Sequence, residues 1–270
     1  MAQNGLFPVS LKRHRNRYWQ RFTSYRFARD LNACPIVTSE VAQITTSFPI
    51  VFQQGTDGYV PVAMLSVVDG LASPVVDQRG RWLAPYVPSI LRCFPFEIGF
   101  SDNSDTETNP VLFVNENSGL VTRDPQDNPF FNADQQLTGD LCDVRFFLQS
   151  RTIAEAQTNR LCKLIAEMEL FVPLQKQDGL TLPQGFWGID TRRLKRLPDT
   201  CALSLLASGA LQLIHAHQIS LAHCAWLYRA QSENVDQSLK PKDSLNRFIS
   251  AMAEDASYLQ ISKGMAHALG

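Results

Sequence analysis

Short apolar segments alternate with turn residues in the first half of the chain, and this is the pattern of a sheet. Residues 48–52 and 59–68 predict two strands joined by a Gly-containing hairpin loop. Residues 94–100 and 111–115 predict a second pair of strands, and the polar, acidic segment 101–109 between them is expected to be a solvated connection.

Two short helices are predicted within this sheet-rich half. Ser39 is a candidate N-cap for a helix that ends near Ser47, because its hydroxyl can accept a hydrogen bond from a backbone N–H of the first turn. Residues 85–93 predict another helix ahead of the next strand. The first half is therefore expected to combine strands with helices.

From Gly139 onward the apolar residues recur at steps of three and four, which indicates helices. We predict two of them, at residues 141–148 and 153–168, with Pro173 ending the second. A segment rich in Gly and Gln, 175–185, is expected to be a loop.

The remaining pattern predicts one more strand and several helices. Residues 186–189 form the strand, after which Asp190 or Thr191 caps a short helix. Residues 199–208 and 210–228 predict two longer helices that meet at a glycine.

These elements predict an α+β fold in which a sheet-rich N-terminal half packs with a mostly helical C-terminal half. We divide the chain into a sheet-rich α+β region at 1–135, a helical region of the same unit at 136–229, a polar linker at 230–243 and a tail at 244–270. The tail is expected to be an amphipathic helix. Its apolar residues are Leu245, Phe248, Ile249 and Met252.

Composition narrows the class of protein. With 270 residues, of which 44% are hydrophobic, the chain can bury a large core. Its 25 basic and 26 acidic residues give a net charge of -1, which creates no global field to attract nucleic acid or an anionic membrane. Any such binding must be local.

The cysteines and the apolar segments favour the cytoplasm. The six cysteines are scattered, without a CxxC pair, and are expected to be mostly reduced, buried thiols. The first 20 residues lack the apolar core of a signal peptide. The longest strongly apolar stretch, 201–214, is shorter than the roughly 20 residues needed to span a bilayer, so no membrane span is predicted.

Short catalytic motifs are absent from the sequence. It contains no GxxxxGK[ST], GxGxxG or GxSxG, and no His is followed two residues later by a carboxylate. His215, His217, His223 and Cys224 form the only metal-like cluster, but helical spacing directs them to different faces and levels. We therefore expect surface or hydrogen-bonded core histidines, no metal and no cofactor.

A basic stretch near the N-terminus is a candidate binding surface. If the stretch forms a strand, three of its arginines share one face. They would then form a solvated sheet edge, and their charge would discourage pairing with the edge strand of another sheet. Aromatic residues at 18, 19, 22 and 25 add the π faces that single-stranded nucleic acid favours, although the neutral overall charge argues against that partner. An acidic protein partner is a further interpretation. The basic patch consists of Arg13, Arg15, Arg17 and Arg21.

A second candidate site lies in the segment that follows residue 80. Trp82 and Tyr86 offer large amphipathic surfaces, the prolines of the segment restrict the chain, and Arg92 could bind a carboxylate. The alternative is that the two aromatic residues simply join the core.

Four segments, at 39–52, 80–96, 158–170 and 189–221, together resemble the bacterial SapC family, whose name suggests a link to surface layers. Their order and spacing match across roughly residues 7–228, and 80–96 is the most specific. A departure is visible at 130–136, where the family usually has an acidic turn containing glycine, and this weakens any argument for cation binding there. The resemblance implies no catalytic residues.

The predicted function is that of a non-catalytic binding or accessory protein, which recognises a peptide, protein or small ligand beside Trp82, Tyr86 and Arg92. The alternative is an enzyme without recognisable short motifs, acting with a partner oxidoreductase or on a surface protein. In that case Arg92, Asp190 and Glu167 would be the first residues to test. Nucleic-acid binding through the basic patch is a weaker third hypothesis.

Overall fold

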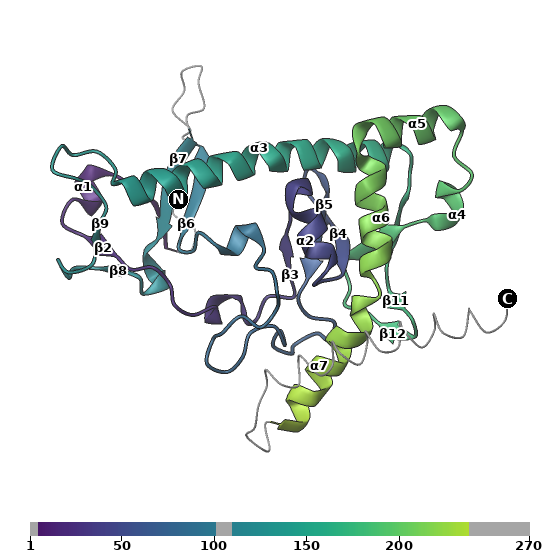
Figure 1. The fold of residues 1–270 in the computed structure, drawn as a ribbon, viewed down its shortest axis with the longest axis horizontal. Coiled ribbons are helices and arrows are strands. Elements are labelled where there is room, and N and C mark those ends of the chain that lie inside the picture. Colours follow the sequence, from purple (N-terminus) through teal and green to yellow (C-terminus); the bar gives the residue numbers. More distant parts are fainter. Residues whose placement is uncertain (1–4, 101–109, 238–270) are drawn as a thin grey trace. The chain divides into compact units, whose positions relative to one another are not determined.

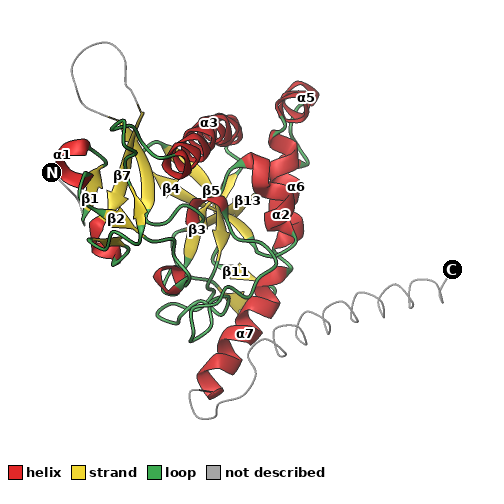
Figure 2. Cartoon of the chain, turned by 60° about the vertical axis from the view of Figure 1, so that its left-hand side comes forward, coloured by secondary structure: helices red, strands yellow, loops and turns green. Residues whose placement is uncertain are grey.

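The computed structural model describes residues 5–100 and 110–237, and these residues fold into two compact units. Among the described residues, unit 1 consists of 5–23, 89–100 and 110–157, and unit 2 of 24–88 and 158–237. Each unit combines strands with helices (Figures 1 and 2), which confirms the predicted α+β class.

Unit 1 contains two small antiparallel sheets, with strand orders β1-β7-β6 and β8-β2-β9. The strands of the first sheet are β1 (Leu6–Pro8), β6 (Phe96–Phe100) and β7 (Pro110–Asn115). Those of the second are β2 (Tyr18–Trp19), β8 (Val121–Thr122) and β9 (Asn128–Pro129). The pairing of β6 with β7 confirms the second predicted pair of strands. The expected connection at 101–109 lies outside the described residues.

The core of unit 1 is aromatic and aliphatic. Trp19 packs edge-on against Phe96, with 5.1 Å between ring centroids. Leu112 and Val114 are both buried because alternate side chains of a strand point to the same face. The buried cluster consists of Trp19, Phe96, Leu112, Val114, Phe130, Leu141 and Leu148.

Unit 2 is built on a five-stranded antiparallel sheet with the order β10-β13-β4-β5-β3. The strands are β3 (Ala33–Pro35), β4 (Ile50–Gly55), β5 (Gly58–Met64), β10 (Phe171–Pro173) and β13 (Phe186–Ile189). Pairing of β4 with β5 runs to Gly55 opposite Gly58, so the predicted hairpin and the strand at 186–189 are confirmed. A small hairpin, β11 (Lys176–Gln177) with β12 (Leu180–Thr181), lies in the segment expected to be a loop.

Helix α6 (Ala210–Ser220) packs against this sheet within unit 2. The Ser220 hydroxyl accepts a hydrogen bond from the backbone N–H of Ile50 at 2.8 Å. Asp190 caps α4 as predicted, because its carboxylate accepts hydrogen bonds from the backbone N–H groups of Arg192 and Arg193. The helices of this unit are α2 (Val41–Thr45), α4 (Thr191–Leu194), α5 (Asp199–Ser208), α6 (Ala210–Ser220) and α7 (His223–Gln237).

The prediction of two helices between residues 141 and 168 was wrong, since a single helix, α3 (Gly139–Glu167), covers both. The residues between the two apolar patterns include neither Gly nor Pro, so nothing interrupts the backbone hydrogen bonds. The helix ends before Pro173, and Glu169 turns the chain with a φ of 51°.

Three further predicted helices differ from the structure. Residues 85–93 form only a 3₁₀ turn at Ser89–Leu91, because the preceding prolines cannot donate backbone hydrogen bonds. Ser39 lies inside the 3₁₀ turn Thr38–Glu40 and is not a cap. The helix expected at 210–228 is divided into α6 and α7. 

Helix α7 extends into the first residues of the expected linker, and the tail at 244–270 lies outside the described residues. No helix in the described part of the chain is both long and apolar enough to cross a membrane.

Candidate functional site

The candidate site is the surface of unit 1 around α1 (Leu11–His14), a single helical turn that begins after the extended residue Ser10. The chain then turns and enters strand β2. The expectation that the basic stretch forms one strand, with three arginines on one face, was therefore wrong. The helical turn directs consecutive basic side chains to different sides.

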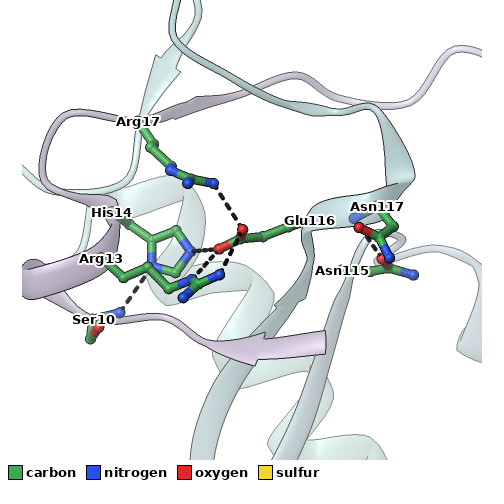
Figure 3. Close-up of polar contacts among 7 residues, drawn as sticks. All are labelled: Ser10, Arg13, His14, Arg17, Asn115, Glu116 and Asn117. Atoms are coloured by element: carbon green, nitrogen blue, oxygen red, sulfur yellow. Dashed lines mark hydrogen bonds and ion pairs between the residues drawn. The ribbon is translucent and has the colours of Figure 1, made fainter. Parts of the chain in front are cut away.

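Glu116 organises the basic residues of this surface (Figure 3). Its carboxylate accepts hydrogen bonds from Arg13 Nε at 2.5 Å, Arg13 Nη2 at 3.1 Å and Arg17 Nη1 at 2.8 Å. The hydrogen bond from Arg13 and the positive charges around Glu116 outweigh its burial, so the pKa of this carboxyl is lowered. The carboxylate thus stays ionised and compensates both arginines.

The backbone holds Glu116 in place through a 3₁₀ turn, Glu116–Ser118, that follows strand β7. The side-chain oxygen of Asn115 accepts a hydrogen bond from the backbone N–H of Asn117 at 3.0 Å and caps this turn. Figure 3 shows Asn115 and Asn117 next to each other, on the side of Glu116 opposite to His14.

His14 is buried beneath the same carboxylate. Its Nδ1 accepts a hydrogen bond from the backbone N–H of Ser10 at 3.2 Å, so the proton of the neutral ring is on Nε2. Nε2 lies 3.2 Å from Glu116 Oε1, although the contact is not aligned as a hydrogen bond. Burial lowers the pKa of His14, while the Glu116 charge opposes this shift. The ring packs against Phe130, with 4.8 Å between centroids.

An open pocket of about 440 Å³ lies beside α1. Lys12 and Arg15 are exposed there and form no ion pair with any described residue. Arg13 also lines the pocket, with its guanidinium 3.6 Å from the Phe7 ring centroid. The lining residues are Leu11, Lys12, Arg13, Arg15, Asn16 and Gln135. A polar pocket with uncompensated cations suits an anionic ligand.

The remaining residues of the predicted basic stretch are less available to contact a ligand. Arg21 forms an ion pair with Asp140 at 3.2 Å. Trp19 is in the core of unit 1, and Phe22 packs edge-on against Phe94 at 6.3 Å between centroids. The aromatic faces that would stack on nucleic-acid bases are therefore partly used in packing.

The second predicted site, at Trp82, Tyr86 and Arg92, is divided between the two units. In unit 2, Trp82 Nε1 donates a hydrogen bond to the backbone oxygen of Tyr86 at 2.9 Å, and the Tyr86 hydroxyl bonds Glu40 Oε2 at 3.0 Å. The Trp82 ring also packs against Tyr25, with 5.4 Å between centroids. Arg92 is exposed and belongs to unit 1. The structure thus brings Trp82 and Tyr86 together, with their polar groups engaged.

Two of the helical histidines, His217 and His223, are hydrogen-bonded to the backbone, and His215 is exposed. His217 Nδ1 lies 2.7 Å from the backbone oxygen of Ile50, and its Nε2 accepts a hydrogen bond from the N–H of Ile189 at 3.3 Å. Burial lowers the pKa of His217 to about 4. His223 bonds the backbone oxygen of Thr45 at 2.9 Å. Among the described residues, no group of three His, Cys, Asp or Glu side chains is placed to hold a metal ion.

The cysteines match the expectation of mostly buried thiols only in part. All six are free, and three of them are buried. Burial raises the pKa of Cys93 to about 11 and that of Cys162 to about 12. These two thiols are therefore poor nucleophiles at neutral pH.

Comparison with known families decides the classification. The SapC family model matches residues 9–227. The chain belongs to the SapC family. The match confirms the predicted resemblance and includes every residue that lines the pocket. No curated protein and no solved structure gave a match.

Sequence reasoning missed Glu116, which is the centre of the site. It lies 103 residues from Arg13 in the chain, inside an ordinary polar turn. Gln135, with a φ of 62°, was likewise not identified as part of a pocket. Neither residue carries a local signal that points to the basic stretch.

Proposed function

We propose that this SapC family member is a non-catalytic binding or accessory protein that recognises an acidic segment of a protein or peptide on the surface around α1. The observation that supports the proposal best is the pocket beside α1. Lys12 and Arg15 are exposed there without a carboxylate partner among the described residues. Carboxylates of a ligand would supply that partner.

The pocket has the size and rigidity of a recognition site. A volume of about 440 Å³ accommodates a few side chains of a peptide. Glu116 and the ring of Phe7 hold Arg13 in one orientation, which reduces the entropy that binding would cost. Asn16 and Gln135 add neutral amide groups that can donate to and accept from a peptide backbone.

A protein or peptide partner fits these observations better than nucleic acid does. Single-stranded nucleic acid would need a continuous basic groove and exposed aromatic faces. Glu116 compensates Arg13 and Arg17, Asp140 compensates Arg21, and Trp19 is buried. The remaining charge suffices for a short acidic segment.

We place recognition in unit 1 and not beside Trp82 and Tyr86, because the indole N–H and the phenol hydroxyl are already hydrogen-bonded within unit 2. The alternative is that the ligand binds at Arg92, and the peptide-binding experiment described next tests this as well.

The test is fluorescence anisotropy of a labelled glutamate-rich peptide with the full chain at several salt concentrations. We expect binding that weakens with salt, and a loss of about tenfold in affinity for the double variant Lys12→Gln/Arg15→Gln. The matched control is Arg160→Gln/Lys163→Gln, which removes two exposed cations from α3 and should leave affinity unchanged.

Three outcomes would reject the proposal. Equal affinity in the Lys12→Gln/Arg15→Gln variant would show that the pocket does not bind the peptide. Tighter binding of single-stranded DNA of equal charge would favour nucleic acid. Loss of binding only in Arg92→Gln would move recognition to the other predicted site.

A further inference from the structure

A second basic segment lies in unit 2, at α4 and the loop that follows it. Its four cations are all exposed. Only one of them has a carboxylate partner among the described residues, since Arg193 forms an ion pair with Glu169. The cations of this segment are Arg192, Arg193, Lys195 and Arg196.

Helix α5, which comes next in the chain, exposes an apolar face. Leu203 and Leu206 are each 62% exposed. They lie three residues apart and so share one face of the helix, whereas Leu205 lies on the other side and is fully buried. Leu205 holds α5 against unit 2, and this orientation necessarily directs the other two leucines outward. Figure 1 shows α5 continuing from the loop after α4.

We propose that this α4–α5 surface attaches unit 2 to an anionic lipid bilayer. Leu203 and Leu206 enter the boundary between head groups and acyl chains, and the cations of the loop contact lipid phosphates. Exposed leucines on a helix that follows a segment of unpaired basic residues are a combination typical of peripheral binding to such membranes. The net charge of the whole chain is only -1, so the attraction acts locally, over this surface.

The exposure of the leucines favours a bilayer over an acidic protein helix. Side chains that are 62% exposed protrude from α5. The hydrocarbon of a bilayer can deform around a protruding side chain. A partner helix, in contrast, is usually bound in a hydrophobic groove. Asp199 lies one turn before Leu203 on the same face and would stay among the head groups. Attachment is therefore shallow.

This inference is independent of the proposed function, because it uses other residues in the other unit. The test is co-sedimentation of the full chain with vesicles of phosphatidylcholine and phosphatidylglycerol, compared with phosphatidylcholine alone. We expect salt-sensitive binding to the anionic vesicles only. The partition coefficient should fall about fivefold for each charge removed in Arg192→Gln/Lys195→Gln/Arg196→Gln.

A leucine variant and two controls complete the design. Leu203→Ser/Leu206→Ser should lower partitioning at least about tenfold. Ile153→Ser, which replaces a residue of matched exposure (64%) on α3, should leave it unchanged. Lys12→Gln/Arg15→Gln should bind vesicles normally even if it loses the acidic peptide, so the two proposals can fail separately. All substituted residues are exposed, and circular dichroism checks that the variants fold.

Three results would overturn the inference. Equal binding to neutral and anionic vesicles would show that the basic residues do not attract the protein to lipid phosphates. Unchanged binding by Leu203→Ser/Leu206→Ser would show that the two leucines do not insert into the bilayer. Capture of an acidic peptide by the α4–α5 surface, without vesicle binding, would assign it to a protein partner.

Discussion

The two basic segments of this chain look alike in sequence and differ in the structure. In the segment at 12–21, Glu116 and Asp140 compensate three of the arginines, although both lie far away in the sequence. In the segment at 192–196, only Arg193 has a carboxylate partner among the described residues. The charge available for binding is therefore set by tertiary partners and not by the density of Arg and Lys.

The two central carboxylates also differ in their surroundings. The Glu116 side chain is 11% exposed and contacts three cationic or titratable groups. The Glu169 side chain is 71% exposed and contacts one arginine. Solvent screens the second pair, so its contribution to stability is small. The first cluster stabilises unit 1, whereas the second leaves a surface open for contacts.

The largest expected effect comes from Glu116→Gln. The change leaves Arg13 and Arg17 without their carboxylate and should lower the free energy of unfolding by about 2 kcal/mol. Urea denaturation measured by circular dichroism checks this. The control is Glu97→Gln, an exposed carboxylate of the same unit, and equal losses in the two variants would contradict the role of Glu116.

A second prediction concerns His217, the buried histidine of unit 2. His217 has backbone partners, and its folded pKa of about 4 is below the ordinary value of 6.5. The unfolded chain therefore takes up a proton first as pH falls, and stability decreases from pH 6.5 toward 4. By about pH 5.5 the loss from this residue should be about 1 kcal/mol.

Urea denaturation at several pH values measures this loss. The slope between neutral pH and about pH 5.5 should flatten in His217→Gln relative to the unsubstituted protein. An unchanged slope would mean that His217 is not held neutral by burial.

The third prediction separates burial from charge at His14. Its folded pKa should lie below 6.5, because burial outweighs the influence of Glu116. Glu116→Gln should lower it further, since the substitution removes the charge that favours the imidazolium ion. NMR titration of the imidazole protons measures both values. A rise in the pKa of the variant would contradict the account of this cluster.

The smallest expected effect comes from Glu169→Gln. The pair with Arg193 is largely exposed, so the free energy of unfolding should change by less than about 0.5 kcal/mol. The same variant should bind anionic vesicles more tightly, because it releases one more cation. A large loss of stability would show that the two basic segments are built alike.

Local signals predicted much of the fold. The hairpin of β4 and β5 was recognisable from two apolar segments around a short Gly-containing turn, and Asp190 was recognisable as a cap before a helix. The continuity of α3 was not, because the apolar pattern changes within a helix that contains no helix-breaking residue there. The two units were also hidden, since each joins segments distant in the sequence.

The candidate site could be predicted only in part. The density of basic residues pointed to Arg13, Arg15, Arg17 and Arg21, but their partners are long-range contacts that no local pattern encodes. The division of the chain at residue 135 and the recognition site at Trp82, Tyr86 and Arg92 stay predictions. The α4–α5 surface was missed because its leucines fit the pattern of a buried helix, and only the structure shows them exposed.

The most direct test of the central claim is to measure two probes on two variants of the full chain. The probes are the glutamate-rich peptide and the anionic vesicles, and the variants are Lys12→Gln/Arg15→Gln and Arg192→Gln/Lys195→Gln/Arg196→Gln. We predict that the first variant loses only the peptide and the second loses only the vesicles. Equal losses of both probes in both variants would contradict the claim, because the two segments would then act as one undifferentiated source of positive charge.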